Sequence, residues 1–393
     1  MLFRPDAFEP LTETPWDERL VRAAIRGIVA DVDRAFDPDT LWPADEWDGW
    51  QAATPMKNLY VGAAGVILAL DMVRRRGEAE TQLDLAAAAL RALAAFRDAP
   101  DFMAGEEPPS QPNSALLRGE VGILLVAWRL GPNADLEHDL LGLVRANVDS
   151  EAEELMWGSP GTLLAARAMA NWTEAGHWQE AAHDGAEALW HRRDDDGYWT
   201  QTLHGFAARG LGPVHGLVGN VLALLPELDE QRRARLTADT SSLLAQTAVV
   251  EDGLANWPIH AGGQLETDDG EIRVQWCAGA PGIVASAASY LDPELLEAGA
   301  ELTWRPGPPG MEKGPCICHG TAGNGYAFLK AFERTGDEKW LDRARRFAMH
   351  ALEQVRRRGH GRYSLWTGDP GVALYAADCL EGRTAYPVLE TWD

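Results

Sequence analysis

Cysteine and basic residues are scarce in this sequence, and it has no long apolar run. Its four cysteines in 393 residues are too few for a disulfide scaffold. No segment approaches the roughly 20 consecutive apolar residues of a membrane-spanning helix. The first residues, MLFRPDAFEP, carry acids and prolines where a signal peptide has its apolar stretch, so we expect a cytoplasmic protein. In that compartment, clustered cysteine and histidine more often indicate a metal or catalytic site than disulfide bonds.

The shortage of basic residues excludes two classes of partner. The chain has 35 Lys and Arg against 60 Asp and Glu, which gives a formal net charge of −25. Such a field repels nucleic acid and anionic membranes, so we expect neither as a partner. A small anionic substrate would need a local basic pocket. The remaining composition, with 46% hydrophobic and 24% charged residues, is typical of a globular protein.

What the sequence does contain is an internal repeat. A Gly-x-x-Gly motif followed by an apolar helical segment occurs seven times, about every 51 residues. The segments that follow it, such as GVILALDMV and GVALYAADCL, are apolar on nearly all sides, as buried helices are. The glycine pairs of the seven motifs are Gly62 and Gly65, Gly119 and Gly122, Gly158 and Gly161, Gly216 and Gly219, Gly279 and Gly282, Gly320 and Gly323, and Gly368 and Gly371.

Seven amphipathic stretches with helical period alternate with the apolar segments, and strand-like alternation is scarce. They are residues 17–36, 77–97, 135–149, 176–192, 229–248, 292–304 and 337–358. A partner for every apolar helix predicts an all-α protein, an α/α toroid of seven inner and seven outer helices that forms one domain over 1–393. An open solenoid of the same helix pairs is the alternative, although solenoids usually have tighter periods. Closure would bring all seven glycine turns to one end of the inner ring.

Two of these turns carry residues that favour a metal ion. Cys277 lies in one turn, and Cys318 with His319 lies in the next. Two thiolates and one imidazole suit one zinc ion, and three protein ligands leave the fourth position open, as in catalytic sites. A substrate thiol entering that position would lose its proton and become a nucleophile. Cys316 is an alternative ligand that could replace or join Cys318.

Three further residues are candidates for substrate chemistry. His215 lies in the glycine turn before that of Cys277, and an ordinary histidine pKa suits a proton donor or acceptor near neutrality. Arg273, four residues before Cys277, could stabilise developing negative charge. Lys313 precedes the Cys-His motif and could bind an anionic substrate group, although both basic residues could equally be solvated charges.

At these residues the chain resembles the lanthionine synthetase C-like family. The segments that carry the resemblance are VHGLVGN, WCAGAPGI, CHGTAGNGYAFL and SLWTGDPGVALYAADCL, and it extends from about residue 60 to the end. The resemblance implies an α/α toroid of seven inner and seven outer helices. It matches Cys277, Cys318 and His319 to zinc ligands, His215 to the general acid/base and Arg273 to an arginine near the first ligand.

The resemblance also implies a reaction, namely addition of a thiol to the double bond of dehydroalanine or dehydrobutyrine to give a thioether. The partner would be a peptide or protein containing a dehydro amino acid, and the thiol a peptide cysteine or glutathione. The CHG-x-AGN-x-YAFL stretch and Tyr386-Pro387 look like the glutathione-adding branch, in which Arg4 and Lys313 could bind glutathione carboxylates. Glu120, in a turn where the family pattern suggests aspartate, is a further substrate-binding candidate.

Three other functions remain open at this point. A dedicated lanthipeptide cyclase would act on one precursor peptide, and a non-catalytic toroid would bind peptides or partners and keep zinc for structure. An α/α-barrel glycoside hydrolase would place paired carboxylates at the same rim. The rim offers Glu120 and Asp369 for that purpose but no accompanying motif, so this alternative ranks last.

Overall fold

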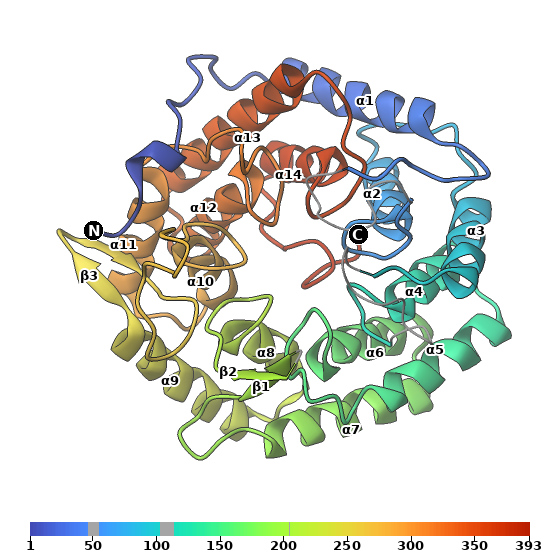
Figure 1. The fold of residues 1–393 in the computed structure, drawn as a ribbon, viewed down its shortest axis with the longest axis horizontal. Coiled ribbons are helices and arrows are strands. Elements are labelled where there is room, and N and C mark those ends of the chain that lie inside the picture. The colour runs from blue at the N-terminus through green and yellow to red at the C-terminus, as the bar shows by residue number, and fades with distance from the viewer. Residues whose placement is uncertain (46–54, 103–113, 204) are drawn as a thin grey trace.

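The computed structural model describes residues 1–45, 55–102, 114–203 and 205–393, and this part of the chain contains fourteen α-helices in two concentric rings (Figure 1). The outer ring consists of α1 (Glu18–Ala35), α3 (Leu85–Asp98), α5 (Ala134–Ala146), α7 (Gly176–His191), α9 (Glu230–Thr247), α11 (Pro293–Trp304) and α13 (Glu338–Arg358). The inner ring consists of α2 (Ala63–Arg75), α4 (Glu120–Leu130), α6 (Ser159–Thr173), α8 (Leu217–Leu224), α10 (Ala280–Ala287), α12 (Thr321–Thr335) and α14 (Asp369–Glu381). The predicted alternation of outer and inner helices is confirmed.

The outer helices bury one face, and all except α7 begin at a polar residue whose side chain caps the helix. Helix α1 buries Val21, Ile25, Ile28, Val29 and Val32, which share one face at helical spacing. Five of the seven outer helices have an aspartate at the N-cap whose side chain accepts backbone N–H groups of the first turn. The outer helices other than α7 therefore begin where the local sequence supplies a cap, and one apolar stripe on each outer helix packs it against the inner ring.

The inner ring is closed. Every inner helix contacts the next one along the chain, and α14 contacts α2, so the last inner helix packs on the first. The toroid is thus confirmed, and the open solenoid is excluded. Because the inner helices alternate with outer ones and all run in one direction from their glycine turns, the seven turns lie at one rim.

The second glycine of each motif has no room for a side chain. In all seven, an added Cβ would lie within 2.4 Å of the carbonyl oxygen six residues earlier in the same turn. All seven would also meet a side chain of the preceding turn around the ring; for Gly65 this is Leu365 of the last turn, at 2.8 Å. The glycines let neighbouring turns pack directly against one another.

Backbone hydrogen bonds join the same turns across the sequence. The N–H of Cys277 donates to the carbonyl of Cys318 at 3.2 Å, Cys318 to Trp366 at 2.9 Å, and Trp366 to Tyr60 at 3.3 Å. Residues from four turns are thereby locked in register at the position that carries the cysteines.

Two short hairpins interrupt the helical pattern. Strands β1 (Gln201–Leu203) and β2 (Phe206–Ala208) pair antiparallel between α7 and α8, and β3 (Val249–Glu251) and β4 (Leu254–Asn256) pair antiparallel between α9 and α10. Both extend the connection from an outer to an inner helix. None of the helices in the described ranges has the length and apolarity to span a bilayer.

Candidate metal centre

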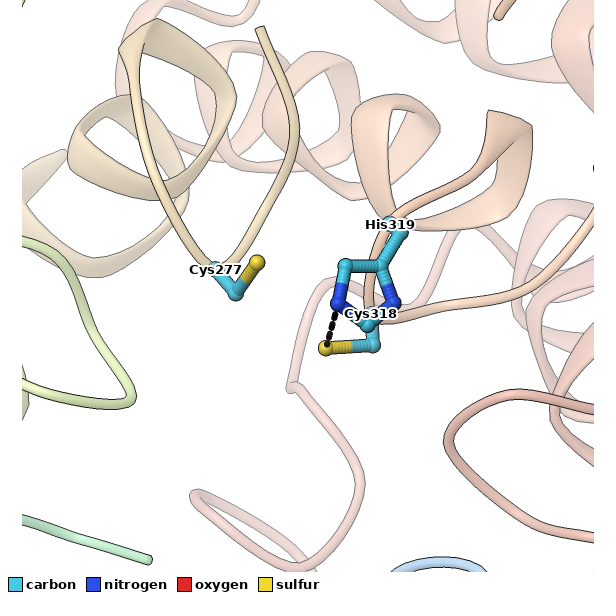
Figure 2. Close-up of side chains that lie close together, drawn as sticks. All are labelled: Cys277, Cys318 and His319. Atoms are coloured by element: carbon cyan, nitrogen blue, oxygen red, sulfur yellow. Dashed lines mark hydrogen bonds between the residues drawn. The ribbon is translucent and has the colours of Figure 1, made fainter. Parts of the chain in front are cut away.

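Cys277, Cys318 and His319 converge at the rim of the inner ring. Both cysteines lie five residues before the second glycine of their turns, and His319 follows directly. One ligand atom from each residue lies within 4.8 Å of the other two. Figure 2 shows the Cys277 sulfur pointing toward the Cys318–His319 pair, in which Sγ and Nε2 are 3.7 Å apart. Tetrahedral zinc ligands at about 2.3 and 2.0 Å lie about 3.5 Å from each other, so the donor set fits this metal.

The charges of the three side chains also suit a cation. A hydrogen bond from Cys318 and the nearby His319 lower the pKa of the Cys277 thiol well below its ordinary value, against the effect of burial. Burial alone would lower the pKa of His319, but the charges and hydrogen bonds of Cys277 and Cys316 together outweigh it and raise that pKa to about 10. These interactions favour the thiolate form of Cys277, and a metal ion would replace the imidazolium proton as its counter-charge.

Each ligand side chain has its own hydrogen-bonding partner. The hydroxyl of Tyr60 donates to Cys318 Sγ at 3.0 Å, and Nε2 of Gln275 donates to Cys277 Sγ at 3.0 Å. Cys316 Sγ donates to the carbonyl of Lys313 at 3.7 Å, and Cys316 does not belong to the convergent group. The geometry therefore favours Cys318 over Cys316 as the candidate ligand.

An aromatic floor lies beneath the two ligand turns. Tyr386, in the segment after α14, is buried and stacks on Trp276 with ring centroids 4.7 Å apart and on Trp366 at 5.7 Å. Its hydroxyl donates to the carbonyl of Ile317 at 2.7 Å. Trp276 and Ile317 directly precede the two cysteines, so this one side chain fixes both turns.

His215 lies in the turn next to that of Cys277, and a buried carboxylate holds its ring. Nδ1 of His215 is 2.6 Å from Oε2 of Glu154, which is fully buried, while the imidazole itself is about half exposed (46%). Burial alone would lower the pKa of His215, but the hydrogen bond and charge of Glu154 and the charge of Cys277 raise it. The imidazole can therefore carry a proton near neutrality and present it at the rim.

Glu154 belongs to no chemical motif in the sequence, although its position in the repeat carries a signal. Glu154 lies seven residues before the second glycine of its turn, where the first turn has Asn58. The side chain of Asn58 accepts the N–H groups of Tyr60 and Val61, and Glu154 likewise accepts two N–H groups of its own turn. A carboxylate in place of an amide at this position adds a negative charge toward the neighbouring turn.

Arg4, Arg273 and Lys313 line one pocket of about 260 Å³, together with His319. Each is ion-paired: Arg273 binds Asp269 at 2.8 Å and also Glu271, which Lys313 approaches at 3.5 Å. The Arg4 guanidinium donates to the carbonyl of Gly270 at 2.9 Å. The structure brings the three predicted basic residues together beside the candidate metal ligands. Asp269 and Glu271 lie among them and offset part of their positive charge.

Glu120 is not brought to this pocket. It is buried at the start of α4 and pairs with Arg97 of α3, which also binds Asp139 of α5. In this position it joins an inner helix to two outer helices, which is a structural role. Its part in substrate binding stays a prediction without geometric support.

A family model and two known proteins match parts of this chain. A family model described as lanthionine synthetase C-like protein matches residues 55–391. Glutathione S-transferase LANCL1 of Danio rerio is 34% identical over 139 residues, 31% of this chain and 33% of that protein. LanC-like protein GCL1 of Arabidopsis thaliana is 29% identical over 157 residues, 38% of this chain and 33% of that protein. The aligned part spans about a third of each relative.

A solved structure, nisin cyclase, has the same fold. It superposes with a TM-score of 0.61 at 14% identity and covers 92% of this chain and 94% of its own. At that identity the likeness concerns the toroid alone. Since the family model matches most of the described ring, the chain belongs to the lanthionine synthetase C-like family.

Proposed function

We propose that the protein adds a thiol to the double bond of a dehydroalanine or dehydrobutyrine residue in a peptide or protein, forming a thioether, with one zinc ion held by Cys277, Cys318 and His319. The convergence of these three side chains, with ligand atoms within 4.8 Å of one another, carries the proposal. Membership of the family supports it, as do relatives whose names describe a cyclase and a glutathione transferase.

The three side chains would hold the metal and leave room for a fourth ligand. When bound, the zinc ion would supply a position for the substrate thiol and lower the pKa of that thiol, giving the nucleophile that free thiols at neutral pH mostly lack. Two sulfurs in the ligand set neutralise the dication, which suits an incoming sulfur better than a water-activating site built from His and carboxylate.

His215 would move the proton. When the thiol sulfur bonds to the β-carbon, the electron pair of the double bond passes to the α-carbon, which must then take up a proton. An imidazole kept protonated by Glu154 at 2.6 Å and half exposed at the rim is suited to deliver it. Arg273, in the adjoining pocket, would stabilise the charge that develops on the acceptor carbonyl.

We propose glutathione as the thiol, because the pocket beside His319 holds three basic side chains, which share it with Asp6, Asp269, Glu271 and Glu312. Glutathione carries two carboxylates, and Arg4 and Lys313 line the pocket that reaches His319. Because Glu271 already pairs with Lys313 and Arg273, an anionic thiol would have to displace it. A peptide cysteine is the other candidate thiol, and its use would make the protein a dedicated cyclase.

Mass spectrometry distinguishes these functions. The zinc-loaded protein is incubated with a dehydroalanine peptide that also contains a cysteine, with and without glutathione. A glutathione adduct supports the transferase reaction, whereas ring closure without glutathione supports the cyclase. Full zinc occupancy with no thioether from any thiol would refute the proposal and favour a non-catalytic, peptide-binding toroid. Cys318→Ala and His215→Ala serve as controls for the metal and the proton.

A further inference from the structure

The proposed reaction creates a hazard for the protein that performs it. The acceptor is an electrophile, and the two cysteine ligands are sulfur nucleophiles beside the place where it must bind. If Cys318 Sγ bonded to the acceptor β-carbon and the α-carbon took up a proton, the product would be a thioether on the protein itself. The protein would then lose a metal ligand permanently. Some feature of the site must therefore make the ligand sulfurs less reactive than the substrate sulfur.

Each ligand sulfur accepts one hydrogen bond from a buried side chain. Tyr60 is 8% exposed and its hydroxyl donates to Cys318 Sγ at 3.0 Å. Gln275 is 7% exposed and its amide donates to Cys277 Sγ at 3.0 Å. A hydrogen bond to an anionic acceptor is stronger than one between neutral groups, and it engages a lone pair of that sulfur.

Both donors are held in place independently of the sulfurs. The Tyr60 ring stacks on Trp366 at 6.0 Å, and its N–H donates to Asn58 at 2.9 Å. Gln275 is fixed by two backbone hydrogen bonds with Ala278, each 3.1 Å long. The donors come from different turns, since Tyr60 reaches Cys318 from the first turn and Gln275 lies two residues before its own cysteine.

We infer that Tyr60 and Gln275 protect the ligand sulfurs from alkylation by the acceptor, each acting on one cysteine. The hydrogen-bonded lone pair is less available for attack, so the ligand sulfur stays on the metal while the substrate sulfur reacts. The need for this protection rests on the proposed function, whereas the hydrogen bonds would slow the reaction of these sulfurs with any electrophile. Tyr60 and Gln275 are thus positioning residues that act through the ligands.

Site-specific alkylation tests the inference. Zinc-loaded wild type, Tyr60→Phe and Gln275→Met are treated with iodoacetamide, which forms an S–C bond and releases iodide, and the modified cysteine is located by peptide mapping. We expect Cys318 to react about three to ten times faster in Tyr60→Phe, and Cys277 by a similar factor in Gln275→Met. Tyr326→Phe is the matched control, since its buried hydroxyl donates to Asp378 at 2.6 Å and not to sulfur.

A spectroscopic measurement checks the same bonds without any electrophile. In the cobalt-substituted protein, the sulfur-to-metal charge-transfer band is expected to shift to lower energy in Tyr60→Phe and Gln275→Met and to remain in place in Tyr326→Phe. Equal alkylation rates in all proteins, acceleration at the same cysteine in both variants, or failure of both variants to retain zinc would each overturn the inference. Absence of thioether formation with a dehydroalanine peptide would refute the proposed function and leave the iodoacetamide result standing.

Discussion

Replacing Glu154 with glutamine tests the assignment of His215 most directly. Oε2 of Glu154 contacts both His215 Nδ1 and the N–H of Met156, and Oε1 accepts the N–H of Trp157 at 2.6 Å. Glutamine has one oxygen for these three contacts. If that oxygen stays on Trp157, the amide nitrogen faces the imidazole and the N–H of Met156 loses its acceptor.

The magnitude follows from this exchange. A donor facing Nδ1 of His215 favours the neutral ring with its proton on Nε2, so the protonated acid is depleted at neutral pH. General acid catalysis contributes about 10²–10⁴-fold, and we expect Glu154→Gln to lower the rate constant for thioether formation by about 10²-fold or more. The buried N–H of Met156 left without its acceptor costs about 1–3 kcal/mol of stability.

The assay is a single-turnover reaction followed by mass spectrometry, with zinc content measured on the same sample. Glu153→Gln is the matched control, because the neighbouring carboxylate pairs with Arg192 and does not contact His215. We expect it to lower stability and to keep the rate. A Glu154→Gln protein with full zinc occupancy and at least a third of the wild-type rate would refute the role given to this pair.

The Glu154–His215 pair also predicts a pH dependence of the free energy of unfolding. Because Glu154 raises the pKa of His215 above its ordinary value, the protonated ring stabilises the folded protein fully below that ordinary value. This contribution is lost as the pH rises through the raised folded value. Urea unfolding of wild type and Glu154→Gln across this range should show the difference between them shrinking as the pH increases.

Three further variants test zinc binding, the close packing of the glycine turns and the hydrogen bond of Tyr386 beneath the candidate metal site. Cys318→Ala should bind zinc about 10²-fold more weakly or worse while its helical circular dichroism is unchanged, as measured by metal analysis after dialysis. Gly323→Ala would place a Cβ 2.1 Å from the carbonyl oxygen of Ile317, and urea unfolding should show a loss of about 3 kcal/mol or more. Tyr386→Phe keeps its stacking but removes the hydrogen bond to Ile317, with an expected loss of about 1–3 kcal/mol in the same assay.

The ring could be predicted because its signals are local and repeated. The glycine motifs recur at the start of every inner helix, and the outer stripes have helical period, so each element is visible in a short window. The observed outer helices begin and end within a few residues of the predicted stretches, except that α3 begins at Leu85 and the prediction at residue 77. Glycine at 77 adopts a left-handed conformation, with φ of 71°, in the connection after α2, and the helix starts only after the Asp84 cap.

The convergence of the candidate metal ligands could also be predicted, because turns that are neighbours in the chain are neighbours in the ring. His215, Cys277 and the Cys318–His319 pair lie in three consecutive turns, and a ring places consecutive turns side by side. The hydrogen bond from Gln275 to Cys277 could not be predicted, because a glutamine alone forms no recognisable sequence motif. The contact of Glu154 with His215 could not be predicted either, because it depends on which side chain of the neighbouring turn faces the carboxylate.

Tyr60 could not have been found by either argument. It lies 258 residues from Cys318 in sequence, and the two turns are separated by that of Trp366 around the ring. For its hydroxyl to reach the sulfur, side chains from turns two steps apart around the ring must meet at the rim. That contact depends on the close packing of neighbouring turns that the motif glycines permit, and on the closure that brings the last turn beside the first. A motif in one turn can therefore predict a candidate ligand, whereas the hydrogen bond from Tyr60 to Cys318 depends on the closed ring.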